Sequence, residues 1–159
     1  MKTALAAVLA AVLAACAAPP EMRSERFWDF WADTAGAFRG LTPGISFDGV
    51  YGRETGVPRY DDELGIQFRR RPAPGVELFV EYHKDSSAKI RAINAEMIFA
   101  DETEARNLHR ECRQHLNQKY RRPEKDGDRL VWKTSDGWLG LRLVAPAKTV
   151  VFSAVADDE

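Results

Sequence analysis

The sequence predicts an α+β fold in which a single antiparallel sheet of about six to seven strands carries two helices on one face, in the order α-ββββ-α-βββ. Three observations support this class. Several segments alternate apolar and polar residues with the period of a strand, and two others repeat apolar residues with the period of a helix. Most strands are separated by short turns rich in Gly, Pro and Asp, which favour antiparallel hairpins. The length of 159 residues indicates one domain.

The first predicted helix covers residues 24–38. Phe27, Trp31 and Phe38 share one of its faces, as residues four and seven apart do in a helix. Two alternatives remain for this aromatic segment. It packs in the core against the sheet, or it contacts a bilayer with Trp28 and Trp31 at the level of the headgroups. We expect the core, because its polar face mixes acidic and basic residues, whereas membrane-surface helices are strongly basic there.

Seven strands account for most of the remaining apolar residues. The third is the clearest, because Val76, Leu78, Val80 and Tyr82 alternate with other residues and share one face. The predicted strands cover residues 45–51, 64–70, 76–82, 89–100, 130–134, 138–144 and 149–155.

The second helix covers residues 101–120. Asp101 can cap it, and an apolar stripe at spacings of three, four and four residues predicts one narrow buried face. The stripe consists of Ala105, Leu108, Cys112 and Leu116.

Composition excludes several classes of protein. The chain has 23 Lys and Arg against 24 Asp and Glu, for a formal net charge of −1, and no long basic block, so we expect no nucleic-acid partner. Two cysteines are too few for a disulfide scaffold.

The first sixteen residues carry the most specific signal. Lys2 precedes a run of small and apolar residues that ends at Cys16, and this run is too short to span a bilayer. It fits the apolar core of a secretory signal peptide. The sequence Leu13-Ala14-Ala15-Cys16 resembles the lipobox of bacterial lipoproteins. The alternative is an ordinary secretory signal cut within Ala15-Cys16-Ala17.

The lipoprotein resemblance implies a domain organisation and a location. Residues 1–15 would be the signal peptide, residues 16–23 the lipidated Cys16 and its tether, and residues 24–159 one α+β domain. The resemblance implies cleavage before Cys16, a diacylglycerol on its thiol and an acyl chain such as palmitate on the new amine. In a Gram-negative cell, Ala17 in place of Asp implies the outer membrane, facing the periplasm of the cell envelope.

Clusters of chemically capable residues are present, but each fits a structural role better. His109, Cys112 and His115 form His-x-x-Cys-x-x-His, yet the two histidines lie about 120° apart around a helix, so we expect no metal site. We expect His83, followed by Asp85, to be a surface residue at a strand end. We expect no cofactor.

The loop carboxylates, two tryptophans and a set of arginines are the remaining candidates. The carboxylates of 61–63 and 126–128 fit solvated turns better than catalytic or calcium sites. Trp132 and Trp138 flank a predicted Asp-Gly turn and are partner anchors if exposed or core residues if buried. A possible binding patch for anionic lipid headgroups or an acidic partner consists of Arg69, Arg70, Arg71, Arg121 and Arg122.

These observations favour a membrane-tethered periplasmic lipoprotein with a non-catalytic binding or assembly role, in which a sheet face or edge docks another envelope protein. Two alternatives stay open. One is an inhibitor of a hydrolase such as a lysozyme, with residues 53–63 entering the enzyme's cleft. The other is a hydrolase that uses His83 with a nearby acid.

Overall fold

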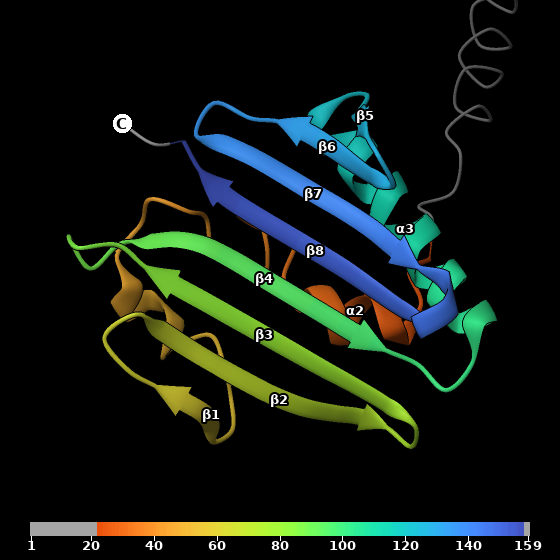
Figure 1. Cartoon of the computed structure of the whole chain (residues 1–159), viewed down its shortest axis with the longest axis horizontal. Coiled ribbons are helices and arrows are strands. Elements are labelled where there is room, and N and C mark those ends of the chain that lie inside the picture. The colour runs from red at the N-terminus through yellow and green to blue at the C-terminus, as the bar shows by residue number, and fades with distance from the viewer. Residues whose placement is uncertain (1–21, 158–159) are drawn as a thin grey trace, which may run out of the picture.

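The computed structural model describes residues 22–157, which form one eight-stranded antiparallel sheet with two α-helices behind it (Figure 1). The predicted antiparallel α+β sheet is confirmed, but the strand number and the order of elements were wrong. The helices are α2 (Glu25–Trp31) and α3 (Glu102–Tyr120), and the strands are β1 (Pro58–Asp61), β2 (Gly65–Ala73), β3 (Val76–Lys84), β4 (Ile90–Ile98), β5 (Glu124–Asp126), β6 (Arg129–Lys133), β7 (Gly137–Val144) and β8 (Thr149–Ala156). Residues 1–15 and Cys16 lie outside the described residues.

The spatial order of the strands is β1-β2-β3-β4-β8-β7-β6-β5. The last strand, β8, therefore lies in the middle of the sheet, where it pairs with β4 on one side and β7 on the other. It joins two consecutive sets of antiparallel strands, one before α3 and one after it. Because β8 pairs with β4, two strands that are far apart in the sequence are neighbours in the sheet.

One predicted strand, residues 45–51, is a 3-10 helix, Phe47–Val50. Its buried residues, Phe47 and Val50, are three apart, which is the repeat of a 3-10 helix and not of a strand. The intervening Asp48 and Gly49 have low strand propensity, and the side chain of Ser46 caps the turn by accepting from the Asp48 amide at 3.4 Å.

The two edge strands, β1 and β5, were not predicted, and residues 123–128 were expected to be a loop. Both edge strands are short, and β5 is exposed at each of its three positions. Neither has the apolar alternation that identifies a strand in a sequence, because an edge strand that packs on nothing needs none. Pro58 is tolerated in β1 because an edge strand leaves one side unpaired.

The first helix is shorter than predicted and ends at Trp31, whereas α3 agrees with the prediction. Beyond Trp31 the chain turns sharply, with Ala32 and Gly36 at positive φ. A Cβ on Gly36 would lie 2.7 Å from the carbonyl oxygen of Leu41, so only glycine permits this close approach. The turn returns Phe38 to the core, where its ring stacks on Phe152 at a centroid distance of 4.7 Å.

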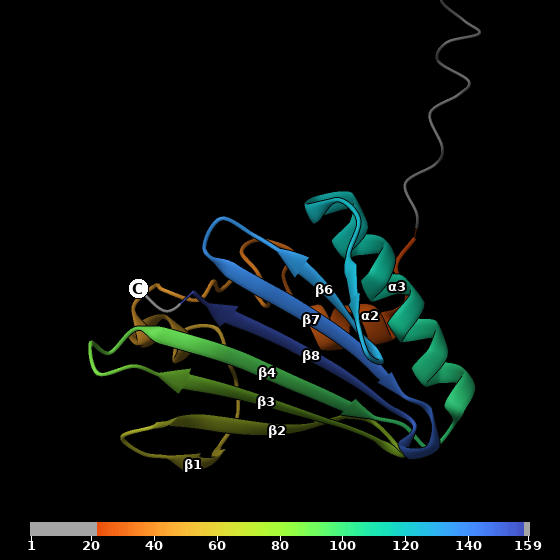
Figure 2. The ribbon, with the colours of Figure 1, turned by 45° about the horizontal axis from the view of Figure 1, so that its top comes forward.

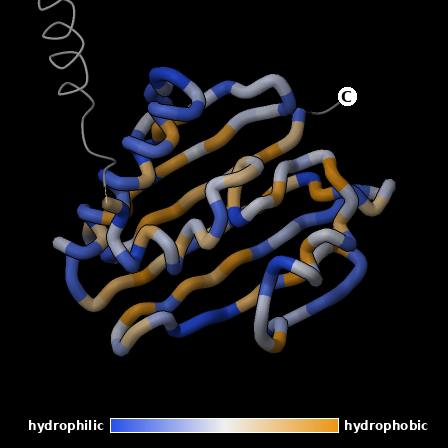
Figure 3. The backbone as a smooth tube through the Cα atoms, turned by 180° about the vertical axis from the view of Figure 1, so that it is seen from behind, coloured by the Kyte–Doolittle hydropathy of each residue, from blue (hydrophilic) through white to orange (hydrophobic). Residues whose placement is uncertain are grey.

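Both helices and the segment 32–57 cover the same side of the sheet (Figure 2). The predicted α3 stripe is buried there against β6, β7 and β8. Seen from this side, apolar residues follow the strands, whereas most of the outer helix and the loops is hydrophilic (Figure 3). The core is therefore confined to one of the two sheet faces.

An aromatic cluster joins α2 to α3 and to β8. The rings of Phe27 and Trp31 stack at 5.8 Å, and both contact the imidazole of His115 on α3. Phe27 and Trp31 are fully buried, so the expected core packing of this segment is confirmed; Trp28 differs, with 47% of its surface exposed. Neither Nε2 of His115 nor Nε1 of Trp31 has a hydrogen-bond partner among residues 22–157.

A buried ion pair fastens the segment 32–57 to the sheet. Arg39 donates to both carboxylate oxygens of Glu54, at 2.5 and 3.1 Å, and to the backbone carbonyls of Asp29 and Phe30 on α2. Glu54 also accepts from the hydroxyl of Tyr82 on β3 at 2.6 Å, and this buried carboxylate together with desolvation raises the pKa of Tyr82. The guanidinium and the carboxylate of the pair are therefore both hydrogen-bonded in the interior.

Replacing Glu54 with Ala should destabilise the protein strongly, because it leaves the Arg39 guanidinium buried without a counter-charge. Removing one partner of a buried pair costs about 3–5 kcal/mol of unfolding free energy, which urea denaturation can measure. The control Glu102→Ala removes the exposed pair with Arg106 and should cost about 0.5 kcal/mol. Equal losses of unfolding free energy in the two variants would show that the buried pair contributes no more to stability than the exposed pair.

Acidification should weaken the fold through His115. Burial, with smaller contributions from Arg23 and Lys119, lowers the pKa of His115 from its ordinary 6.5 to about 4. The unfolded chain therefore binds this proton more readily, so the stabilisation is complete above about pH 6.5 and falls as the pH drops towards 4. We expect the urea midpoint to fall less over this range in His115→Phe than in the parent protein; identical pH dependences would contradict the assignment.

Candidate functional site

No helix or loop of residues 22–157 covers the second face of the sheet, which forms the candidate binding surface. Along each inner strand, the residues that alternate with the buried core residues point to this side. We call it the open face. A row of paired residues crosses its centre from β6 to β2, and it consists of Val131, Gly140, Ser153, Asn94, Glu81 and Gln67.

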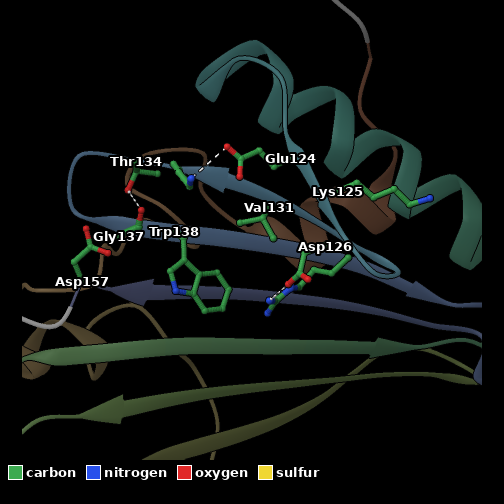
Figure 4. Close-up of a pocket in the computed structure, with 10 residues that line it drawn as sticks. Glu124, Lys125, Asp126, Val131, Thr134, Gly137, Trp138 and Asp157 are labelled. Atoms are coloured by element: carbon green, nitrogen blue, oxygen red, sulfur yellow. Dashed lines mark hydrogen bonds and ion pairs between the residues drawn. The ribbon is translucent and has the colours of Figure 1, made fainter.

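Trp138 on β7 lies on the open face (Figure 4), and Arg129 on β6 contacts its ring. The guanidinium of Arg129 lies 4.8 Å from the centroid of the Trp138 ring system, and its Nη2 donates to Asp126 at 2.6 Å. Both side chains lie over Gly140, where a Cβ would come within 3.2 Å of the Trp138 ring and 3.0 Å of the Arg129 Cδ. The absent side chain therefore lets the indole and the arginine lie close to the sheet.

Two shallow hollows adjoin this pair of residues. The first, of about 410 Å³, lies between β5 and Trp138 and is partly lined by Glu124, Val131 and Lys133. The second, of about 350 Å³, continues across Gly140 to Arg142 and Ser153. Asp126 and Arg129 line both, so we treat the two as one surface, the Trp138 groove.

A second aromatic residue lies further along the open face. Phe79 on β3 has the guanidinium groups of Arg59 and Arg69 at 5.7 and 5.5 Å from its ring centroid. The strand register places Phe79 three strands from Arg142, which is four residues beyond Trp138. Strand spacing and rise then separate Phe79 from Trp138 by about 20 Å.

A polar cluster that contains His83 lies on the same face as Phe79, on β3 and its neighbouring strands. Its Nε2 is 3.4 Å from Glu81 and 3.2 Å from the Asn94 amide. Tyr60 donates its hydroxyl to the same Glu81, and desolvation and this carboxylate raise the pKa of Tyr60. Within residues 22–157, no hydrogen bond joins His83 to a serine, threonine or cysteine; its side-chain contacts are with Glu81 and Asn94.

The arginines of the predicted patch do not lie together. Arg69 and Arg71 lie on the open face of β2, and each pairs with Glu77. Arg121 and Arg122 follow α3, and the carbonyl of Arg121 accepts from the Trp132 indole on β6. Four strands, β3, β4, β8 and β7, lie between β2 and β6 in the sheet (Figure 1). The arginines of β2 and those that follow α3 therefore do not form one continuous patch.

The helix residues considered for metal binding have structural positions. Cys112 is fully buried, and burial raises the pKa of its thiol, so it acts as an apolar core residue. His115 belongs to the aromatic cluster. Within residues 22–157, no group of three His, Cys, Asp or Glu side chains could hold a metal ion, and no helix in this range is long and apolar enough to cross a membrane.

The loop carboxylates also stabilise turns. Asp62 accepts from the amides of Leu64 and Gly65 at 2.8 and 3.1 Å, which closes the turn between β1 and β2. Within the loop proposed to enter an enzyme, Glu54 is buried and residues 58–61 form β1. Asp128 lies 3.8 Å from Arg142 as an exposed pair.

Sequence reasoning singled out Trp138 but missed its partner and the second aromatic. Trp132 is buried and Trp138 is half-buried on the open face, so one of the pair is core and the other is a candidate anchor. The alternation of β3 could have placed Phe79 opposite the core residues Leu78 and Val80. Nothing in the linear sequence pairs Arg129 with Trp138, because that contact depends on the register between β6 and β7.

Comparisons with known proteins add no relationship: no family model matches the chain, and no curated protein or solved structure matches it significantly.

Proposed function

We propose that this protein is a lipid-anchored lipoprotein of the cell envelope that binds a protein partner, without catalysis, through the open face of its sheet. The observation that carries the proposal is the pair of half-buried aromatics, Trp138 and Phe79, each covered by arginine on a face that no element of the domain covers. The anchor is supported by the resemblance of Leu13-Ala14-Ala15-Cys16 to a lipobox.

The composition and size of the open face favour a protein partner. Trp and Arg are enriched among the residues that dominate binding energy at protein interfaces. A standard interface buries about 800 Å² per partner, a patch about 30 Å across, and the two aromatics, about 20 Å apart by strand spacing, fit within it. The hollows beside them are open surface depressions, whereas small-molecule sites bury most of their ligand.

The face is a better docking site than either sheet edge. The outer strands β1 and β5 are four and three residues long, and Lys125, Asp126 and Arg59 place charges on them. Short, charged edges of this kind discourage the pairing of a further strand. The docking mode that remains is side-chain contact across the face.

Docking through the open face should depend on Trp138. Loss of a residue at the centre of an interface costs 2 kcal/mol or more, which is about a thirtyfold loss of affinity, so Trp138→Ala should lose most captured partner. The control Val57→Ala removes a residue that is 87% exposed and lies off the open face, and it should change nothing.

The measurement is photo-crosslinking of the full chain in cells, with the crosslinker placed at Ser153 on the open face or at Asn107 on α3. We expect one reproducible envelope protein from Ser153 that disappears with Trp138→Ala. Capture of a hydrolase would favour the inhibitor role. A partner that crosslinks from Asn107 and not from Ser153 would contradict the proposed surface.

The anchor can be tested separately with Cys16→Ser. This change removes the thiol that would carry diacylglycerol, so incorporation of labelled palmitate should be lost and the protein should leave the membrane fraction. Ala17→Ser alters the adjacent residue, retains the thiol and should keep both the label and the membrane location. Unchanged labelling in Cys16→Ser would overturn the lipobox assignment.

A further inference from the structure

The outer surface of α3 carries arginines that have no acidic partner. Arg110, Arg113, Arg121 and Arg122 are exposed, and none of them forms a salt bridge with a residue of the described range 22–157. Most of the other arginines do, including Arg106, which pairs with Glu102 one turn earlier on the same helix. The four unpaired arginines, called here the α3 arginine flank, therefore leave positive charge without a counter-charge.

Helix geometry keeps this flank away from the core. At 100° per residue, Arg113 lies about 100° and Arg110 about 160° around the axis from the buried Cys112. Arg121 follows Arg113 by eight residues, or about 12 Å along the axis. The flank thus forms a row on the solvent side of the helix that continues into the loop before β5.

The acids of α3 do not neutralise this row. Glu104 lies about 120° around the axis from Arg110. Glu111 accepts hydrogen bonds from the amide and the hydroxyl of Ser24, at 3.2 and 2.6 Å. That carboxylate is therefore committed to the start of α2, about 100° around the axis from Arg110.

The chain enters the domain at this same helix. Arg23 donates to the carbonyl of Glu111 and to the side chain of Gln118, both at 3.0 Å. Seven residue steps lead from Cys16 to Arg23, and they span at most about 25 Å when fully extended. A lipid on Cys16 would consequently keep α3 close to the bilayer surface.

The residues beside the chain entry suit an interface between water and lipid. Met22 is 97% exposed, and Trp28, one helical turn after Ser24, is 47% exposed. Tryptophan is enriched at the headgroup level of membranes. The neighbouring aromatic residues Phe27 and Trp31 are buried, so Trp28 is the member of the segment available for such contact.

We propose that the α3 arginine flank docks on anionic phospholipid headgroups and holds the helix layer against the membrane. The inference rests on the lipid anchor of the proposed function for its geometry, and on the unpaired charge for its chemistry. It orients the molecule, because the open face lies on the opposite side of the sheet from α3 (Figure 2) and is then directed away from the bilayer. Each basic residue near an anionic surface strengthens binding about fivefold.

The test uses the full chain, purified from membranes and placed in vesicles of phosphatidylcholine with or without phosphatidylglycerol. A fluorophore is attached to Asn107→Cys on α3 or to Ser153→Cys on the open face, and lipids with a nitroxide headgroup quench any label near the surface. Cys112 is buried and does not compete for the label. We expect strong quenching of the Asn107 label in anionic vesicles, little quenching of the Ser153 label, and loss of the difference in high salt.

A matched pair of variants isolates the arginines. Changing Arg110, Arg113, Arg121 and Arg122 to Gln should reduce quenching at Asn107 to the level found in neutral vesicles. Changing Arg69, Arg71, Lys89 and Arg142 to Gln removes the same charge elsewhere on the surface and should leave the quenching unchanged.

The failure of the two proposals can be distinguished. If the protein is anchored but the Asn107 label responds neither to anionic lipid nor to the four arginine changes, the headgroup site is overturned while the anchor stands. If Cys16 carries no lipid, retention of the chain by anionic vesicles still tests the site: dependence on the four arginines supports it, and independence overturns it.

Discussion

The buried pair of Arg39 and Glu54 holds the helix-side layer of this domain together. The segment 32–57 contains only one short 3-10 helix, yet it covers part of the sheet behind β2 to β4. Five hydrogen bonds meet at the pair and connect this segment to α2 and to Tyr82 on β3. Removing two charges from water is unfavourable, and these hydrogen bonds offset that cost. A segment with little regular structure is thereby attached both to α2 and to β3.

A consequence of this one-sided construction is the polarity of the molecule. The core uses one face of the sheet, where the aromatic cluster, the α3 stripe and the buried pair lie. The other face carries exposed cross-strand pairs such as Arg69 with Glu77 and Lys133 with Glu124. These exposed pairs contribute little to stability and leave the face free to exchange its partners. The division between a stabilising side and an available side supports the proposed binding role.

The elements that sequence predicts well are those whose periodicity reflects the core. Strands β3 and β4 and helix α3 alternate or repeat around residues that are buried, such as Val80, Ile93 and Leu108. The edge strands bury little and leave no such pattern. The spacing of Phe47 and Val50 fits a 3-10 helix better than a strand. The early end of α2 depends on the close approach of Gly36 to Leu41, which local helix propensity does not predict.

The candidate site was less predictable than the fold because it depends on long-range pairing. The sequence identifies Trp138, His83 and the arginine runs as separate candidates, each from its own side-chain chemistry. Their neighbours follow from the placement of β8 between β4 and β7, which separates Arg69 from Arg121 and brings Ser153 next to Gly140.

The edges of the same sheet have a further effect. The proposed lipid anchor would confine the protein to two dimensions, where crowding promotes the pairing of one sheet with another. Because β1 and β5 are short, they offer a neighbouring copy few free backbone groups, so each molecule would stay separate on a densely occupied surface.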